Sequence, residues 1–111
     1  MRDVSPPSLD QRLRWLVEDL RKYQPQKIIL FGSAARGDHD ASSDLDVVMI
    51  KQTTTAFVQR SLDAVAYVRP EVVPVDILVY TPEEFRRMAE DENPFLERVM
   101  AEGRVLYETA A

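Results

Sequence analysis

Two aspartates, Asp44 and Asp46, are the residues of this chain whose type and spacing most directly suggest chemistry. They stand two positions apart at the start of an apolar run, so in a strand both side chains project to one side, while Leu45 and Val47 point into the opposite layer. Neighbouring carboxylates repel each other and raise each other's pKa unless a cation lies between them. Carboxylate oxygens suit a hard divalent ion such as Mg²⁺, so the pair predicts a metal site.

Gly32 and Ser33 form a second candidate feature upstream of the aspartates. A strand that ends at a glycine and turns directly into a helix presents free backbone N–H groups at the helix N-terminus, where the helix dipole also favours an anion. Ser33 is expected to be the N-cap and to add a hydroxyl donor. The turn therefore predicts a site for a phosphate of a nucleoside triphosphate, next to the metal.

The sequence around these residues resembles the DNA polymerase β nucleotidyltransferase superfamily. Gly32-Ser33, ten further residues and Asp44-Leu45-Asp46 are similar to its signature, and the longer strings 32–37 and 43–47 are similar to its minimal nucleotidyltransferase branch. In that branch a later strand supplies a third acidic residue, and Asp76 stands in such a run here. The resemblance implies an α/β fold, more narrowly α+β, in which helices cover a small mixed sheet.

The resemblance also implies a role for each residue of the site. Asp44, Asp46 and Asp76 would hold two Mg²⁺ ions, one positioning the phosphates and the leaving pyrophosphate and the other activating the attacking hydroxyl. Gly32 and Ser33 would grip the triphosphate of ATP, and Asp76 would also be a candidate base for the hydroxyl proton. Attack at the α-phosphorus would transfer a nucleoside monophosphate and release pyrophosphate.

Arg36 and Ser43 are further candidate nucleotide-binding residues, and each has an alternative role. Arg36 lies one helical turn after Ser33, so it could reach a phosphate or could brace the loop through an ion pair with Asp44 or Asp38. Ser43 precedes Asp44 and could orient that carboxylate instead of contacting substrate.

The acceptor of the nucleotide is expected to come from another protein, because this chain has no residues to spare for an acceptor-binding domain. The minimal branch resembles the antitoxins of toxin–antitoxin pairs whose partner is a HEPN-domain ribonuclease, and its family activity is AMP transfer from ATP to a partner tyrosine. One alternative is a binding module that neutralises the partner by covering it. Another is a stand-alone enzyme for a small hydroxylated molecule. The three carboxylates favour the enzyme, because binding alone would not need so strained a cluster.

The composition limits the other classes of function. The chain has 111 residues, enough for a single nucleotidyltransferase domain over 1–111 in which 1–7 form a loose arm. The net charge is −5 and no run of Lys or Arg occurs, so the basic surface typical of nucleic-acid binding is missing. The absence of cysteine excludes disulfides, and no apolar run is long enough for a membrane span. We therefore expect a cytoplasmic protein without a nucleic-acid or membrane partner.

Apolar periodicity and capping residues predict the elements that position this site. Helical spacing begins after Ser8, and two later helices begin at Thr81 and Asn93, each of which precedes a proline. Runs of apolar residues predict the strands. The expected helices cover 9–23, 53–69, 82–90 and 94–103, and the expected strands cover 27–31, 45–50, 72–80 and 104–107. The last two helices could pack internally or form a surface for a homo- or hetero-oligomer.

Asp76, Trp15 and His39 each allow two interpretations. Asp76 is the only charge in its predicted strand, where a buried carboxylate would need a partner; alternatively, it is a surface residue on an edge strand marked by Pro74. Trp15 falls off the apolar stripe of the first helix, so it belongs to the core or contacts a partner. His39 lies in a polar loop and is given no role.

Overall fold

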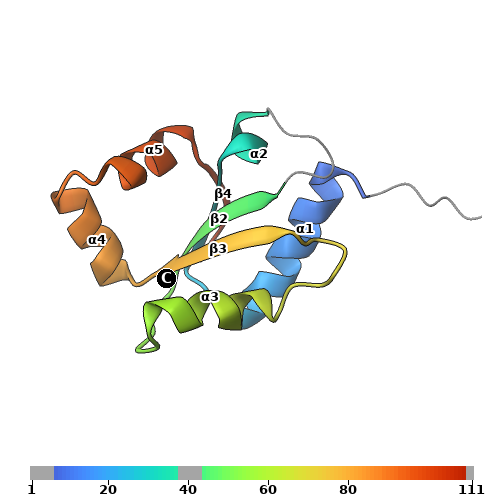
Figure 1. The fold of residues 1–111 in the computed structure, drawn as a ribbon, viewed down its shortest axis with the longest axis horizontal. Helices are drawn as coiled ribbons and strands as arrows, with labels where there is room; N and C mark the ends of the chain where they lie inside the picture. The colour runs from blue at the N-terminus through green and yellow to red at the C-terminus, as the bar shows by residue number, and fades with distance from the viewer. Residues whose placement is uncertain (1–6, 38–43, 110–111) are drawn as a thin grey trace, which may run out of the picture.

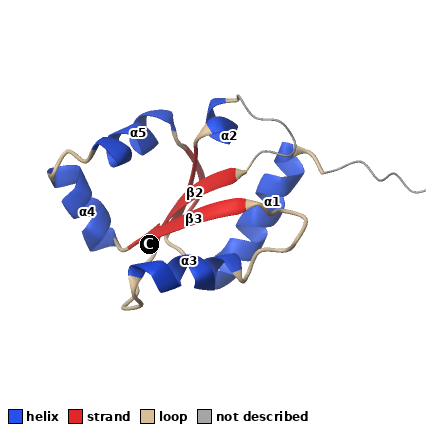
Figure 2. Ribbon diagram, viewed as in Figure 1, coloured by secondary structure: helices blue, strands red, loops and turns tan. Residues whose placement is uncertain are grey.

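Four apolar stretches pair into one sheet with the strand order β3-β2-β1-β4 (Figures 1 and 2). The structure is a computed structural model and describes residues 7–37 and 44–109. The strands are β1 (Lys27–Phe31), β2 (Leu45–Ile50), β3 (Val75–Tyr80) and β4 (Arg104–Glu108). β1 is antiparallel to β2 and β4, whereas β2 and β3 are parallel. The parallel pair requires a crossover, which runs through helix α3 (Phe57–Val65).

Side-chain caps start three of the other helices where the sequence predicts them. The Ser8 hydroxyl accepts a hydrogen bond from the Gln11 N–H, and Thr81 forms a capping box with Glu84. The Asn93 side chain accepts from two backbone N–H groups of the last helix. The helices are α1 (Leu9–Leu20), continued by a 3₁₀ turn at Arg21–Tyr23, then α2 (Ser33–Arg36), α4 (Pro82–Glu90) and α5 (Pro94–Glu102). None of the helices in 7–37 and 44–109 is both long and apolar enough to cross a bilayer.

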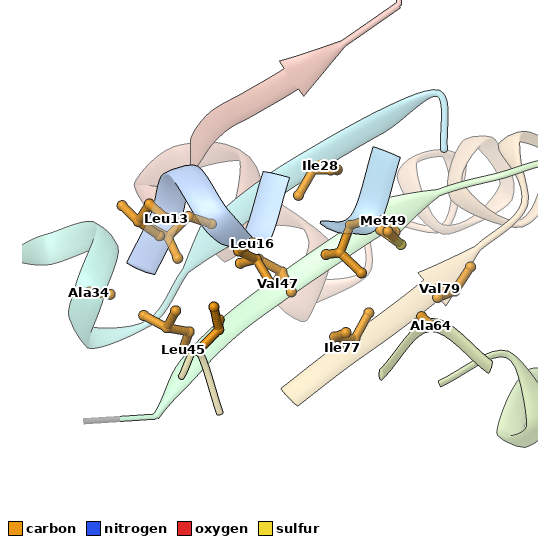
Figure 3. Close-up of a cluster of buried hydrophobic side chains, with 13 residues drawn as sticks. Leu13, Leu16, Ile28, Ala34, Leu45, Val47, Met49, Ala64, Ile77 and Val79 are labelled. Carbon is orange, nitrogen blue, oxygen red and sulfur yellow. The ribbon is translucent and has the colours of Figure 1, made fainter. Parts of the chain in front are cut away.

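The two faces of the sheet carry separate apolar clusters because side chains alternate along each strand. On the first face, Leu45 and Val47 pack with residues of α1 and α3, as Figure 3 shows. On the second face, Val48 packs with Val99 of α5. Figure 1 shows α4 and α5 on the side of the sheet opposite to α1. Asp46 alternates with Leu45 and Val47, so it belongs to the second face.

Two elements are shorter than the sequence predicts, because hydrogen bonds between side chains and the backbone take the place of regular structure there. α3 begins at Phe57 instead of 53, since the Thr55 N–H donates to the hydroxyl of Thr53. β3 begins at Val75 instead of 72, and the Arg12 guanidinium of α1 binds the Val72 carbonyl at 2.8 Å. The chain before β3 is therefore held by α1 at Val72, and at Pro74 its carbonyl accepts from the Leu45 N–H at the start of β2.

A buried ion pair fastens α1 to the turn that follows α3. Asp19 is only 3 % exposed, and its carboxylate accepts from Arg69 Nε at 2.9 Å and from Arg69 Nη2 at 2.7 Å. The Arg69 backbone N–H also donates to Asp19 at 2.9 Å. The guanidinium lies over the ring of Trp15, 5.2 Å from its centroid. Trp15 is therefore partly buried against this pair and packs on the core, the first of its two interpretations.

Candidate active site

Asp46 of β2 and Asp76 of β3 are direct neighbours across the parallel ladder. Strand alternation places both on the second face of the sheet. Asp46 is half-buried, and burial raises the pKa of its carboxyl; the charges of Asp76 and Asp44, and a hydrogen bond with Asp76, raise that pKa further. The two carboxyls thus share a site in which negative charge is unfavourable without a cation.

Asp76 is exposed on an edge strand, so the prediction that it is a buried charge is wrong. The alternative interpretation gives its position correctly, since the carboxyl lies on a surface strand that begins just after Pro74. The register with Asp46 makes this exposed carboxyl part of the acidic pair. Exposure also leaves Asp76 accessible to a substrate.

Gly32 forms a cradle for the Asp46 carboxylate. Its backbone has φ 74 and ψ −156, a combination that essentially only glycine adopts. A Cβ atom at this position would lie 2.7 Å from Asp46 Oδ2. Phe31, the preceding residue, is the partner of Asp46 across the β1–β2 ladder. The N-cap of α2 is therefore in direct contact with Asp46.

Ser33 is the first residue of α2, and Gly32 is its N-cap, which corrects the prediction that Ser33 caps the helix. The amides of Ala35 and Arg36 already donate to the Gly32 carbonyl. Those of Ser33 and Ala34 have no acceptor within a helix that begins at this point. The half-buried Ser33 therefore offers both an amide and a hydroxyl beside Asp46.

Asp44 is exposed and lies immediately before β2, whose bounds of 45–50 are as predicted, so its side chain stands outside the strand alternation that the aspartate spacing suggested. Within 7–37 and 44–109, no three His, Cys, Asp or Glu side chains form a group ready to hold a metal ion. Asp44 still acts on Asp46 through its charge. The carboxylate donors of Asp46 and Asp76 fit a hard divalent cation.

The acidic pair opens into a groove of about 570 Å³ with mainly apolar walls. Leu62 and Val65 of α3 form one wall, and Phe31 and Phe95 form part of the other. The two phenylalanine rings meet edge to face with centroids 5.5 Å apart. Apolar walls lower the local dielectric constant, which strengthens electrostatic interactions at the carboxyls.

A family model for the nucleotidyltransferase domain matches residues 13–107. The chain belongs to the nucleotidyltransferase domain family. Two solved structures resemble this nucleotidyltransferase domain in fold. One is described as "a putative nucleotidyltransferase from Sulfolobus solfataricus", with 20% identity, a TM-score of 0.58 and coverage of 90% of this chain and 86% of that one. The other is a toxin–antitoxin structure with AMP-PNP, with 18% identity, a TM-score of 0.53 and coverage of 92% and 75%.

No curated protein sequence matches the chain. The matches that do exist confirm the predicted fold class, an α+β fold like that of the polymerase β-type nucleotidyltransferases. The likeness in fold extends over 90% of this chain for the first structure and 92% for the second.

Arg36 of the nucleotidyltransferase domain lies at the end of α2, with its guanidinium 3.8 Å from the Glu102 carboxylate. Both residues line a small pocket of about 140 Å³ behind Gly32, together with Phe95 and Arg98. Glu102 could not be predicted as the partner of Arg36, because the two residues are 66 positions apart. Three residues considered in the sequence analysis lie outside the described part of the chain: Asp38, His39 and Ser43.

Several residues that line the groove were not predicted to belong to the site. Leu62, Val65 and Phe95 belong to amphipathic helices, in which periodicity indicates an apolar face but not the surface that it meets. Ser61 also lines the groove, and its hydroxyl donates to the Ile77 carbonyl at 2.7 Å. Only the packing of α3 and α5 against the sheet shows that these residues surround the acidic pair.

The substitution Gly32→Ala is expected to destabilise the domain by about 2 kcal/mol and to displace Asp46. The alanine Cβ would contact Asp46 Oδ2 in a backbone conformation unsuited to it, and the flexible carboxylate would move away. Urea unfolding measures the first effect and nucleotidyl transfer the second. Gly37→Ala is the matched control, since Gly37 has φ 83 but open space around it. Equal rates of nucleotidyl transfer by Gly32→Ala and Gly37→Ala would contradict the role of the contact between Gly32 and Asp46.

Proposed function

We propose that this domain is a Mg²⁺-dependent enzyme that transfers AMP from ATP to a hydroxyl, a tyrosine hydroxyl in particular, of a partner protein. The proposed partner is a HEPN-domain toxin, which the transfer of AMP neutralises. The chain thereby acts as an antitoxin in the cytoplasm. One observation carries the proposal: Asp46 and Asp76 are paired in register, and the Asp46 carboxylate lies against Gly32, the N-cap of α2. This arrangement supports a cation site at the two carboxyls beside a phosphate site at the start of α2.

Each part of the site has a distinct task in this reaction. Asp46 and Asp76, joined by Asp44, hold the Mg²⁺ ions, which when bound neutralise phosphate charge and lower the pKa of the acceptor hydroxyl. The amides at the start of α2 and the Ser33 hydroxyl bind the triphosphate. Arg36 and Ser43 are proposed as further nucleotide contacts. The apolar walls of the groove exclude water, which would otherwise compete with the acceptor.

The proposed reaction forms one bond to the α-phosphorus of ATP and breaks another. The acceptor oxygen attacks the α-phosphorus of ATP and forms a new P–O bond. The bond between the α-phosphorus and the oxygen that bridges to the β-phosphorus breaks, and pyrophosphate leaves with that electron pair. Asp76 accepts the hydroxyl proton, because it is the exposed member of the pair and can reach an incoming substrate.

Two observations support a protein as the acceptor. A toxin–antitoxin structure with AMP-PNP shares the fold of this chain. Among the described residues, the groove beside the carboxyls is lined mainly by aliphatic and aromatic side chains and by no Lys or Arg. Such walls suit the ring of a tyrosine better than the phosphates of a nucleic acid. The HEPN identity of the partner rests on the resemblance of the motif to the minimal branch.

A binding module without transfer is the second candidate function. It is favoured by the position of Asp44, which stands before β2 and does not complete a three-residue metal group in the described part of the chain. In that case the chain neutralises its partner by covering it.

Labelled ATP separates the two functions. The complex with the co-purified partner is incubated with Mg²⁺ and ATP labelled at the α- or the γ-phosphate, and label on protein is followed on a denaturing gel. We expect one partner band, labelled from the α-phosphate alone and absent with the double variant Asp44→Asn, Asp46→Asn. Asp91→Asn on the exposed end of α4 is the matched control and keeps the band. A stable complex without label supports the binding module.

Asp44→Asn is expected to leave the metal-free protein at least as stable as the wild type and to abolish the rise in melting temperature produced by MgATP. The substitution removes a charge that disfavours ionised Asp46 and also removes a metal ligand. Differential scanning fluorimetry with and without MgATP measures both effects, with Asp91→Asn again as control. The same rise in the Asp44 variant would show that Asp44 is not part of the site.

A further inference from the structure

Helix α3 carries a group of exposed apolar side chains. Phe57 is 38 % exposed, Val58 is 75 % exposed and Leu62 is 57 % exposed. The other large apolar side chains that are exposed in the described part of the chain stand apart from this group, at Tyr67, Val73, Met100 and Val105. Single exposed apolar side chains are normal on a protein surface, whereas neighbouring ones mark a contact site. The outer side of α3 is therefore a candidate contact site.

The attachment of α3 to the rest of the domain depends on other residues of the helix. Ala64 is buried in the core, and the Ser61 hydroxyl donates to the Ile77 carbonyl at 2.7 Å. The Arg60 guanidinium, also buried, forms an ion pair with the Glu84 carboxylate at 2.7 Å. The exposed apolar side chains are thus not what holds α3 in place, and water remains in contact with them at a cost in free energy.

Three apolar residues of α3 form a stripe that leads to the acidic pair. Val58, Leu62 and Val65 follow one another at intervals of four and three residues, so they share one side of the helix. Leu62 and Val65 also line the groove that contains Asp46 and Asp76. These three residues, the α3 stripe, therefore extend from the open surface at Val58 into the groove beside the two carboxyls.

The acidic pair lies between α2 and the α3 stripe. In the sheet, β1 and β3 flank β2 on opposite sides, and α2 follows β1 directly. Gly32, the N-cap of α2, lies against Asp46, whereas α3 is bound to β3, the strand that carries Asp76. Figure 1 shows α2 and α3 on opposite sides of β2 and β3. A substrate bound at α2 therefore leaves the α3 side of the carboxyls open.

The direction of phosphoryl transfer gives each side a different substrate. The attacking and the leaving oxygen lie roughly in line, on opposite sides of the phosphorus. In the proposed function the triphosphate is bound at Gly32 and Ser33, so pyrophosphate leaves on the α2 side. The acceptor hydroxyl then approaches from the side of Asp76 and α3. A hydroxyl that belongs to a protein brings its neighbouring residues with it, and these residues meet α3.

We propose that the α3 stripe is the docking surface for the segment of the partner protein that carries the acceptor hydroxyl. This assignment rests on the proposed function and adds to it the surface that selects the acceptor. The segment presents aliphatic or aromatic side chains next to the acceptor residue, and Val58 and Leu62 lose their contact with water when it binds. Because these side chains have no polar group, they contribute to binding and not to the chemical step.

Val58→Glu and Leu62→Glu test the docking surface in the complete chain. Transfer from α-labelled ATP to the purified partner is measured at saturating MgATP. Each variant is expected to raise the KM for the partner at least about tenfold, while kcat and the KM for ATP stay within about twofold of the wild type. Leu62→Met should keep the wild-type KM. Val105→Glu, on the exposed β4 strand at the far edge of the sheet, is the matched control.

The rise in melting temperature with MgATP shows that the variants are folded and still bind nucleotide. It should be the same in Val58→Glu, Leu62→Glu and the wild type, because neither side chain contacts the nucleotide in the proposed arrangement. An unchanged KM for the partner in both glutamate variants would overturn the docking surface while transfer by the wild type upholds the proposed function. A raised KM for ATP would assign the stripe to the nucleotide base and would also overturn it.

Photo-crosslinking separates a failure of the docking surface from a failure of the proposed function. Leu62→p-benzoylphenylalanine, with Val105→p-benzoylphenylalanine as control, is irradiated with the partner, and the crosslinked peptides are identified by mass spectrometry. We expect position 62 alone to crosslink, to the partner peptide that receives AMP. A crosslink from 62 to the partner without any transfer would contradict the proposed function and support the docking surface. Crosslinks from 62 to a second copy of this chain instead would overturn the docking surface.

Discussion

The substitution Asp46→Asn is expected to make the metal-free domain more stable while it lowers nucleotidyl transfer about a thousandfold. Burial and the charges of Asp76 and Asp44 disfavour the ionised carboxyl, which is why its pKa is raised. Asparagine has nearly the same shape, carries no charge and can donate a hydrogen bond to Asp76. The folded protein is therefore relieved of an unfavourable charge at neutral pH.

The loss of transfer follows from the second role of the same carboxylate. A bound metal ion stabilises the charge of the transition state by several kcal/mol. Each 1.4 kcal/mol corresponds to a factor of ten in rate, so loss of the metal ligand is expected to lower the rate about 10³-fold. A residue whose removal stabilises the fold and abolishes activity serves the reaction rather than the structure. A variant that is less stable than the wild type, or that transfers at the wild-type rate, would contradict the assignment of Asp46.

The raised pKa of Asp46 also predicts how the stability difference between Asp46→Asn and the wild type depends on pH. Because the pKa of Asp46 is raised, the folded state binds its proton more tightly than the unfolded state, and lowering the pH through this interval favours folding. Urea unfolding should show the stability difference between Asp46→Asn and the wild type at neutral pH. The difference should shrink as the pH falls and vanish below about pH 4, where an unperturbed aspartate also becomes protonated.

The substitution Asp19→Ala is expected to destabilise the domain by about 2 kcal/mol, or about 10 °C in melting temperature. The substitution leaves the Arg69 guanidinium and backbone N–H without the buried carboxylate to which both donate. The Arg69 side chain is 27% exposed, so water can solvate part of the abandoned charge, and the loss is smaller than for a fully buried pair. The contact between Arg69 and Trp15 weakens as well.

Glu18→Ala is the matched control for Asp19→Ala. Glu18 also binds Arg69, at 3.1 Å, but its side chain is 66 % exposed, so its removal should change the stability by less than about 1 kcal/mol. Arg69 lowers the pKa of Asp19, so the stabilisation is present above the ordinary aspartate pKa and disappears as the pH falls. Thermal unfolding at neutral and acid pH should show the gap between Asp19→Ala and the wild type closing in acid. Equal losses for the two alanine variants would contradict the burial argument.

The sequence allowed the strands and caps to be predicted because their causes are local. Leu45 and Val47 enter the core by alternation, and Thr81 and Asn93 carry side chains that bind nearby amides. The predicted starts of α3 and β3 are wrong, because the hydrogen bonds made by Thr53 and Arg12 cannot be recognised from apolar periodicity. These errors come from specific side-chain contacts with the backbone.

The candidate site was predictable in its members and not in its arrangement. The motif identified Asp46 and Asp76 as partners, but only the strand register shows that they are direct neighbours. The contact between Gly32 and Asp46 depends on the pairing of β1 with β2, which lies beyond local sequence. For the same reason the aromatic wall from Phe31 and Phe95 became visible only in the fold.

The connection between the two edge strands determines where this fold can accept inserted segments. β3 and β4 lie at opposite edges of the sheet, and α4 and α5 form the whole connection between them. Both ends of this connection are fixed by ladder hydrogen bonds, whereas the turn between the two helices, at 91–93, includes the exposed residues Asp91 and Glu92. Insertions are tolerated best at such exposed turns. Extra modules, whether acquired in evolution or added by an engineer, can therefore enter here while the strand register that pairs the two aspartates is kept.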